Sequence, residues 1–317
     1  MPNKLEFEAA YKLLESKLQE LKDLSVKLNC DFSSEIANVE KRLNELKEER
    51  YQNLTPWEQV LMARDLERPM TRDYIRLLLS DWVEMHGDRV FGDDPAIVGG
   101  VGLFCGRAVT VLGHQKGKDT PGNISHNFGM PHPEGYRKAF RLMQEAEKFN
   151  RPVLTFINTP GAYPGTEAEE RGQAWAISQL LLLLSRIRVP VVSLVTGEGG
   201  SGGALALTGV DRIIMLSNAV YSVASPETCA SILFRDVKKA DESASALKLT
   251  ARALLEIGIV DEVIEEPAHE PLIDSESFIS SVKRSLKKSL DILCSLEPQE
   301  LVERRYQRLS QIGEFHE

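Results

Sequence analysis

The chain has 317 residues, 42% hydrophobic and 27% charged, so it can bury a large core, and disorder throughout is excluded. Its 38 Lys and Arg residues face 47 Asp and Glu residues, and the resulting net charge of −9 argues against nucleic-acid binding through bulk charge. The longest apolar run, residues 180–184, is far short of the roughly 20 residues that a membrane-spanning helix needs, and residues 1–10 lack the apolar core of a secretory signal. We therefore expect a cytoplasmic protein without membrane association.

Residues 4–28 carry leucines at steps of three and four between Lys and Glu, which is the pattern of an amphipathic helix. A polar turn at residues 29–34 leads into a second such pattern that ends at Arg50. Two helices joined by a short turn predict an antiparallel hairpin. We assign residues 1–51 to this hairpin and residues 52–317 to one α/β domain that ends in helices. A hairpin so rich in leucine favours a role in subunit contact, and the alternative is a solvated arm. The apolar stripes consist of Leu14, Leu18, Leu21, Leu24 and Leu28, followed by Ile36, Val39, Leu43 and Leu46.

The rest of the chain alternates strand and helix patterns. Strands are predicted at residues 97–104, 107–113, 152–158, 189–195 and 212–216, the first two as a hairpin. Helices are predicted at residues 71–83, 134–150, 168–186, 244–257 and 278–293, with a short one from residue 204. Strands that alternate with helices predict a mostly parallel sheet with crossover helices. The glycine-rich stretch 113–133 is too long for a passive connector, so we expect it to carry function.

The four cysteines are scattered, with no C-x-x-C pair and no histidine at ligand spacing. Neither a disulfide framework nor a metal site is predicted. We interpret them as packing or surface thiols. They are Cys30, Cys105, Cys229 and Cys294.

The most unusual segment is the run GEGGSGGA at residues 197–204, between a predicted buried strand and a helix start. So many glycines predict the close approach of a ligand or of another backbone segment. N–H groups at a helix start lack an intrahelical acceptor and lie at the positive end of the helix dipole. They therefore suit an oxyanion.

This run satisfies two unrelated motifs. The pattern G-x-G-x-x-G is typical of a dinucleotide site, but Ser217 and Asn218 stand where an acidic residue is expected about 20 positions later. The pattern G-x-S-x-G around Ser201 is typical of a hydrolase, but the only later histidines, His269 and His316, lie in polar stretches near the chain end. A third interpretation is that the glycines only allow tight packing between strand and helix.

Two further segments are candidates for ligand contact. The turn TPGAYPG at residues 159–165 follows the preceding predicted strand, and loops at the carboxyl ends of neighbouring parallel strands share one sheet edge. We expect it to line a common crevice with the glycine run, although an ordinary Pro-Gly turn has the same composition. The segment GHQKGK at residues 113–118 lacks the order of a P-loop, so ATP binding is not predicted. Lys116 and Lys118 are interpreted as solvated, and the alternative is a contact of either lysine with a phosphate or a carboxylate.

Side-chain machinery for catalysis does not stand out in the sequence. We find no pair of carboxylates, no metal cluster and no Cys-His or Ser-His-Asp order. If the protein is an enzyme, backbone amides must carry much of the catalysis. Chemistry through an enolate fits this constraint, because two N–H groups can stabilise the charge that develops on a carbonyl oxygen.

Long characteristic strings are spread over nearly the whole chain. They are GHQKGK from residue 113, NFGMP from 127, PEGYRKA from 133, NTPGAYPG from 158, EERGQ from 169, GEGGSGGALA from 197 and RRYQRL from 304. These strings resemble the alpha subunit of the bacterial-type acetyl-coenzyme A carboxylase carboxyltransferase. This resemblance favours a carboxyltransferase over a dehydrogenase or a hydrolase.

The resemblance implies a crotonase-like spiral fold and transfer of a carboxyl group from carboxybiotin to acetyl-coenzyme A, giving malonyl-coenzyme A for fatty-acid synthesis. Carboxybiotin would be supplied in trans by the biotin carboxyl carrier protein. The implied assembly is an α2β2 heterotetramer with a beta subunit, whose chain would share the active site and hold the zinc. ATP would be used only by the separate biotin carboxylase component. The alternative is a stand-alone crotonase-like acyl-coenzyme A hydratase or decarboxylase.

By the same resemblance, the amides of Gly202 and Gly203 hold the biotin ureido oxygen. Carboxybiotin would release CO2, biotin would then take a proton from the acetyl methyl, and the thioester enolate would attack CO2. We expect Gly203→Val to abolish turnover with the fold intact and Ser201→Ala to be mild. Further substrate-binding positions are Gly199, Gly200, Gly161, Ala162 and Tyr163, and no metal ligand is assigned.

Overall fold

The computed structural model describes residues 4–28, 31–208, 211–268 and 270–313. The chain divides into two compact units. The first consists of Met1–Thr55 with Pro267–Glu270, and the second of Pro56–Glu266 with Pro271–Glu317. Cys30, His269 and His316 lie outside the described residues.

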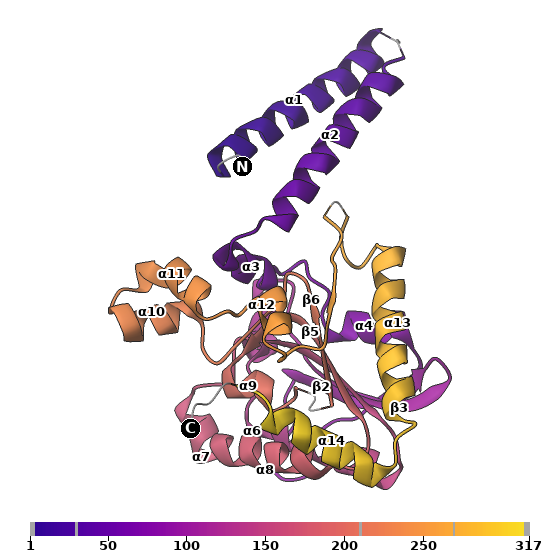
Figure 1. Ribbon diagram of the computed structural model, residues 1–317, viewed down its shortest axis with the longest axis vertical. Helices are drawn as coiled ribbons and strands as arrows, with labels where there is room; N and C mark the ends of the chain where they lie inside the picture. Colours follow the sequence, from indigo (N-terminus) through magenta and orange to yellow (C-terminus); the bar gives the residue numbers. More distant parts are fainter. Residues whose placement is uncertain (1–3, 29–30, 209–210, 269, 314–317) are drawn as a thin grey trace. The chain divides into compact units, whose positions relative to one another are not determined.

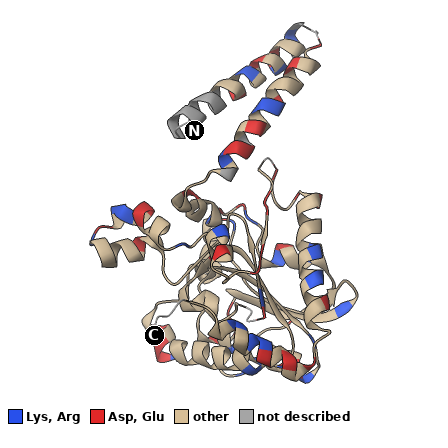
Figure 2. Ribbon diagram, viewed as in Figure 1, with Lys and Arg blue, Asp and Glu red and all other residues tan. Residues whose placement is uncertain are grey.

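The first unit contains two long helices, α1 (Lys4–Leu28) and α2 (Ser33–Gln52), which pack against each other. Positive and negative side chains both lie along the coloured parts of these helices (Figure 2), and Lys22 pairs with Glu40 across the hairpin at 2.9 Å. On α2 the side chains of Val39, Leu43 and Leu46 are buried. The helical pattern predicted from the leucine spacing is confirmed, because three-and-four spacing places these side chains on one face.

The second unit is built on one eight-stranded mixed sheet (Figure 1). The strand order is β1-β2-β3-β4-β5-β6-β8, and β7 pairs with β5. The pairs β1–β2 and β2–β3 are antiparallel, and every later pair is parallel. The strands are β1 (Leu79–Glu84), β2 (Ile97–Phe104), β3 (Arg107–His114), β4 (Val153–Thr159), β5 (Val191–Gly200), β6 (Arg212–Leu216), β7 (Val220–Ser222) and β8 (Glu262–Ile264).

Helices connect and cover these strands. The helix α6 packs against α8 and against β2 and β3, while α13 contacts β5. The helices are α3 (Pro56–Ala63), α4 (Thr71–Leu78), α5 (Thr120–Ser125), α6 (Pro133–Lys148), α7 (Thr166–Glu170), α8 (Gln173–Arg186), α9 (Ser201–Leu205), α10 (Pro226–Phe234), α11 (Ala240–Ala246), α12 (Ala251–Glu256), α13 (Glu276–Leu293) and α14 (Pro298–Ser310), with 3-10 turns η1 (Asn127–Gly129) and η2 (Val237–Lys239).

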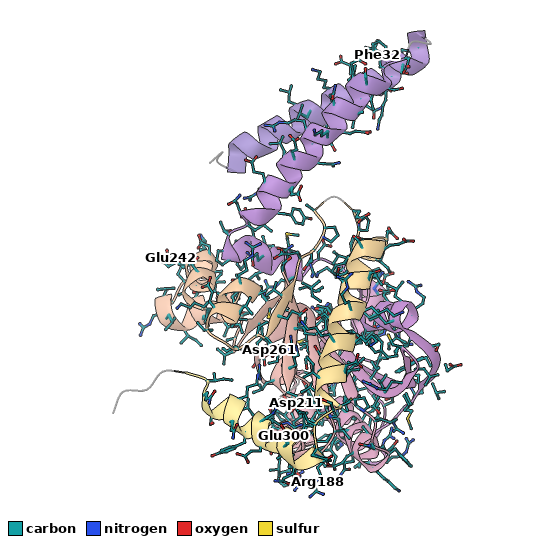
Figure 3. All side chains as sticks on the ribbon, turned by 45° about the vertical axis from the view of Figure 1, so that its right-hand side comes forward. Phe32, Arg188, Asp211, Glu242, Asp261 and Glu300 are labelled. Carbon is teal, nitrogen blue, oxygen red and sulfur yellow. The ribbon has the colours of Figure 1, made fainter. Side chains whose placement is uncertain are left out.

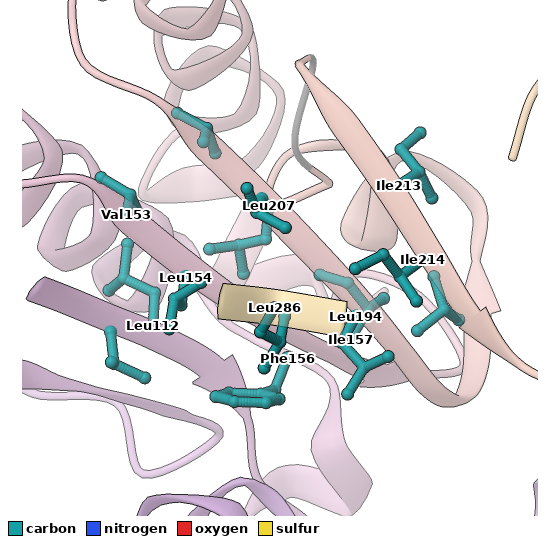
Figure 4. Close-up of a cluster of buried hydrophobic side chains, with 14 of the residues drawn as sticks. Leu112, Val153, Leu154, Phe156, Ile157, Leu194, Leu207, Ile213, Ile214 and Leu286 are labelled. Carbon is teal, nitrogen blue, oxygen red and sulfur yellow. The ribbon is translucent and has the colours of Figure 1, made fainter. Parts of the chain in front are cut away.

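The core lies around β4 and β5. Every residue of β4 is buried, as expected for a parallel strand covered on both faces. Figure 4 shows Leu154 and Phe156 of β4 beside Leu194 of β5, together with Leu286 of α13. The ring of Phe156 also stacks on Tyr74 of α4, with centroids 5.1 Å apart.

The last helix, α14, is tied to the strand region by two ion pairs. Arg305 binds Asp211 with Nε and Nη2 at 2.8 and 2.9 Å, and both side chains are almost fully buried. Arg308 binds Asp261 at 2.9 Å, and Figure 3 labels both aspartates. The sequence patterns did not predict α14, because the helix is polar and is stabilised by these distant partners.

Several predicted elements differ in the structure. The helix predicted over 71–83 ends at Leu78, where the chain turns into β1. The helix predicted over 168–186 is divided into α7 and α8 at Gly172, whose φ of 83° is incompatible with a continuous right-handed helix. The one predicted over 244–257 is divided into α11 and α12 because Lys248 has a φ of 50° and Thr250 caps α12.

Candidate functional site

The glycine run begins as a strand and ends as a helix. The predicted strand over 189–195 extends to Gly200, since residues 198–200 pair with β7. Ser201 then turns the chain with a φ of 56°, and α9 starts there. We call residues 198–203 the glycine turn.

Close backbone contacts explain two of its glycines. A Cβ on Gly200 would lie 2.1 Å from the carbonyl oxygen of Pro160, and a Cβ on Gly203 would lie 2.4 Å from the nitrogen of Ala162. The 159–165 turn therefore packs directly against the glycine turn, which confirms that the two segments share one sheet edge. The expectation that Gly203→Val would leave the fold intact is wrong, because a side chain there collides with backbone.

Gly202 differs from these neighbours. A Cβ built on it meets no atom within 4 Å, so its Cα faces open space. Among the described residues, the amides of Gly202 and Gly203 make no hydrogen bond to a protein acceptor, as expected at the start of a helix. The turn thus combines two free donors with an open approach at Gly202.

The other predicted binding residues have backbone or ring contacts within the protein that limit how they could bind a ligand. The N–H of Gly161 donates to Thr159 Oγ1 at 3.0 Å, and the N–H of Tyr163 donates to the carbonyl of Pro131 at 3.0 Å. Neither amide is therefore free for a ligand. The Tyr163 ring stacks on His132, with centroids 4.0 Å apart, which brings the end of the 113–133 stretch to the same place. Gly199 pairs with Tyr221 of β7, and Ala162 contacts Gly203.

The sequence patterns did not predict a buried network of ion pairs at the glycine turn. Glu198 Oε2 lies 3.0 Å from Nζ of Lys116, and Glu198 Oε1 lies 2.6 Å from Nε of Arg64. Arg64 also binds both carboxylate oxygens of Glu227 on α10, at 2.5 and 3.1 Å. The interpretation of Lys116 as solvated is wrong, since the residue is 8% exposed. The available signal was one acidic residue inside a glycine run.

The network sets the charge states of its members. Burial alone would raise the pKa of Glu198, but the positive charges of Lys116 and Arg64 and their hydrogen bonds hold it below its ordinary value. Burial lowers the pKa of Lys116, and Glu198 opposes that shift. Glu198 is thus an ionised carboxylate whose charge is balanced by Lys116 and Arg64. Both of its oxygens are engaged, so it is poorly suited to act as a general base.

Two buried polar rings lie near Gly203. Burial, with a smaller contribution from Lys116, lowers the pKa of His114 to about 3, so the imidazole is neutral at pH 7. Burial raises the pKa of Tyr136 well above its ordinary value, and its hydroxyl would lie 2.9 Å from a Cβ on Gly203. Both groups are therefore uncharged at pH 7.

The described residues contain no cluster of metal ligands. No group of three or more His, Cys, Asp or Glu residues is placed to hold a metal ion there. In the same part of the chain, no helix has the length and hydropathy needed to cross a membrane.

Known structures with a similar fold include a chain of transcarboxylase 12S, with a TM-score of 0.60 at 22% identity over 73% of this chain and 43% of that one. A chain of a Pseudomonas malonate decarboxylase hetero-tetramer, determined with coenzyme A, has a TM-score of 0.59 at 17% identity over 78% of this chain and 95% of that one. The fold is therefore crotonase-like, of the kind found in carboxyltransferases.

Sequence relatives are much closer. The acetyl-coenzyme A carboxylase carboxyl transferase subunit alpha of Syntrophomonas wolfei is 53% identical over 98% of both chains, and that of Thermus thermophilus is 51% identical over 99% of both. The family model described as acetyl co-enzyme A carboxylase carboxyltransferase-like matches residues 4–313. The chain belongs to this family, and the family resemblance inferred from the sequence strings is confirmed. The dinucleotide and hydrolase interpretations of the glycine run are thereby excluded.

Proposed function

We propose that this chain provides half of a carboxyltransferase site that moves a carboxyl group from carboxybiotin to acetyl-coenzyme A, giving malonyl-coenzyme A. One observation carries the proposal: two amides that have no acceptor within the described part of the chain lie at a turn whose Cα at Gly202 faces open space. The names of the relatives support acetyl-coenzyme A as acceptor and an alpha subunit role.

The residues at the turn fit a biotin ureido group. That group presents an uncharged carbonyl oxygen, which two N–H donors can hold without a cation or a metal. A Cβ on Gly202 would meet no atom within 4 Å, so the open space beside this residue leaves room for a ring. The nearby lysine, Lys116, is engaged by Glu198 and so does not compete for the ligand.

In this proposal the chain acts through its backbone. The amides of Gly202 and Gly203 stabilise negative charge on the ureido oxygen, and each such donor is worth roughly 10²–10³ in turnover. Bound carboxybiotin supplies the carboxyl group and, once decarboxylated, the base. His114 and Tyr136 are neutral and Glu198 is paired with Lys116 and Arg64, so none of these three side chains is available as a general base beside the amides.

The proposal includes the other components of the reaction. The acceptor thioester would be held by a beta subunit in an α2β2 assembly, and residues 1–51 would serve as a subunit contact beside a catalytic domain of residues 52–317. The biotin carboxyl carrier protein would deliver carboxybiotin. Zinc would be bound by the beta chain, and ATP would be used by the separate biotin carboxylase. We place the assembly in the cytoplasm, where malonyl-coenzyme A would enter fatty-acid synthesis.

A hydratase or decarboxylase that works alone is less well supported. A hydratase needs a free acid or base next to the acyl group, and the carboxylate of the glycine turn, Glu198, has both oxygens in ion pairs. The imidazole of His132, near the adjacent turn, is held by Asn127 through Nδ1 at 3.0 Å and stacks on Tyr163.

The test is to purify the chain alone and together with a beta subunit and to measure malonyl-coenzyme A decarboxylation with biocytin as the carboxyl acceptor. We expect activity only from the complex. Turnover by the chain alone would contradict a shared site. A stable, active homotrimer or homohexamer would favour the stand-alone enzyme.

A further inference from the structure

The glycine turn contains few side chains that could hold it in place. Between Glu198 and Ala204 the chain has four glycines and Ser201, and Ser201 is exposed. Ala204 is buried and anchors the helical end. Glu198 is therefore the side chain that anchors the strand end of the turn.

Three distant segments meet at Glu198. Lys116 comes from the stretch that follows β3, Arg64 follows α3, and Asn158 lies near the end of β4, where its Oδ1 accepts the backbone N–H of Glu198 at 3.2 Å. Lys116 is itself confined, because its Cγ would lie 2.6 Å from a Cβ on Gly129. The carboxylate therefore has one well-defined position.

Burying these charges is costly. The side chains of Lys116 and Glu198 are 9% and 12% exposed, and removing two charges from water often costs more than their attraction returns. Well-packed apolar residues of similar volume are often at least as stabilising as a buried ion pair. An ion pair differs from an apolar contact in that it specifies direction as well as proximity.

We propose that Lys116 and Arg64 are positioning residues that hold Glu198 and thereby fix the direction of the Gly202 and Gly203 amides. The proposal rests on the function proposed above. Oxyanion donors must aim at the place where charge develops, and a displacement of about 1 Å can cost about 10²-fold in rate. Arg64 is held in turn by Glu227, so the anchor extends to α10.

The test uses the complex of this chain with a beta subunit and the variant Lys116→Met, which keeps an unbranched side chain one atom shorter than that of lysine and removes the charge. We expect kcat to fall about 10-fold to 100-fold, while KM for the acyl-coenzyme A stays within about twofold, because a displaced donor affects the transition state more than binding. Glu198→Gln should give a similar loss, and the double variant should be no worse than either single one, because both disturb the same anchor. Lys118→Met is the matched control, since Lys118 is on the same loop, half-exposed, and should keep the parent kcat.

A second measurement does not depend on activity. Hydrogen exchange of the peptide that spans residues 197–207 should become at least about ten times faster in Lys116→Met and stay unchanged in Lys118→Met. The reason is that its hydrogen-bonded amides, such as those of Glu198 and Ala206, open more often once the anchor is lost. If Lys116→Met does not fold, Glu198→Gln provides the same comparison.

Unchanged kcat and unchanged exchange in a folded Lys116→Met complex would overturn the positioning role. Losses that multiply in the double variant would also overturn it, because they would show independent effects of Lys116 and Glu198. Absence of carboxyl transfer by the parent complex would instead refute the proposed function, and the exchange data would still decide on the anchor.

Discussion

Gly202→Ala separates a functional glycine from a structural one. A Cβ at this position meets no atom within 4 Å, and the residue lies in α9. Replacing a helical glycine by alanine stabilises the folded state by about 0.5–1 kcal/mol, because the unfolded chain loses freedom. We therefore expect the free energy of unfolding to stay equal or to rise.

Turnover should change in the opposite direction. If a ureido ring approaches the open face of Gly202, the added methyl displaces it from the donors, and kcat should fall by roughly 10²–10³, as for the loss of one oxyanion donor. Gly202→Leu should reduce it further. Gly203→Ala provides the contrast, because its Cβ would collide with backbone 2.4 Å away and should cost about 1–3 kcal/mol of stability.

The assay is malonyl-coenzyme A decarboxylation by the complex with a beta subunit, combined with urea unfolding of each variant. Ser201→Ala is the matched control, because Ser201 is exposed next to Gly202. It should retain most of the turnover. Full activity in Gly202→Ala would refute the reasoning, since the ligand would then not use the open face.

Three further predictions concern stability. His114→Gln should flatten the pH dependence of the free energy of unfolding. The pKa of His114 is about 3 in the folded protein, below its ordinary 6.5, so its contribution to stability is complete above pH 6.5 and falls by about 2 kcal/mol between pH 7 and 5. A variant with the same pH profile as the parent would contradict this. Arg305→Met should cost about 3–5 kcal/mol in urea unfolding, because it removes the charged partner of the buried Asp211 and leaves only the N–H of Val191 on that carboxylate. The double variant with Asp211→Asn should recover part of the loss. Gly172→Ala should cost about 1–2 kcal/mol because of its positive φ, and a neutral result would mean that the backbone relaxes there.

Local patterns predicted much of the fold. The strands at residues 97–104 and 212–216 and the helix near residues 278–293 follow the predicted bounds closely. They are long apolar or strongly periodic segments, and such patterns depend only on residues that are close together in the sequence. The shared edge of the glycine turn and the 159–165 turn was also predictable, because consecutive parallel strands place their carboxyl ends together.

Other features depend on contacts across the chain. The apolar runs do not reveal that β5 continues through glycines to Gly200, because β7 supplies the pairing that makes it a strand. Nor do they reveal that Lys116 is buried, since its partner Glu198 is 82 residues away. A lysine in a polar loop is solvated by default unless the fold brings a carboxylate to it.

The sequence alone therefore determined the family, the helical hairpin and the glycine turn with its unsatisfied amides, because motif spacing and periodicity are properties of adjacent residues. The tertiary structure decided which glycines are required for packing, which one faces open space, and what holds the turn in place. These properties depend on atoms that meet only after the sheet has formed, such as the nitrogen of Ala162 against Gly203 and the guanidinium of Arg64 against Glu198.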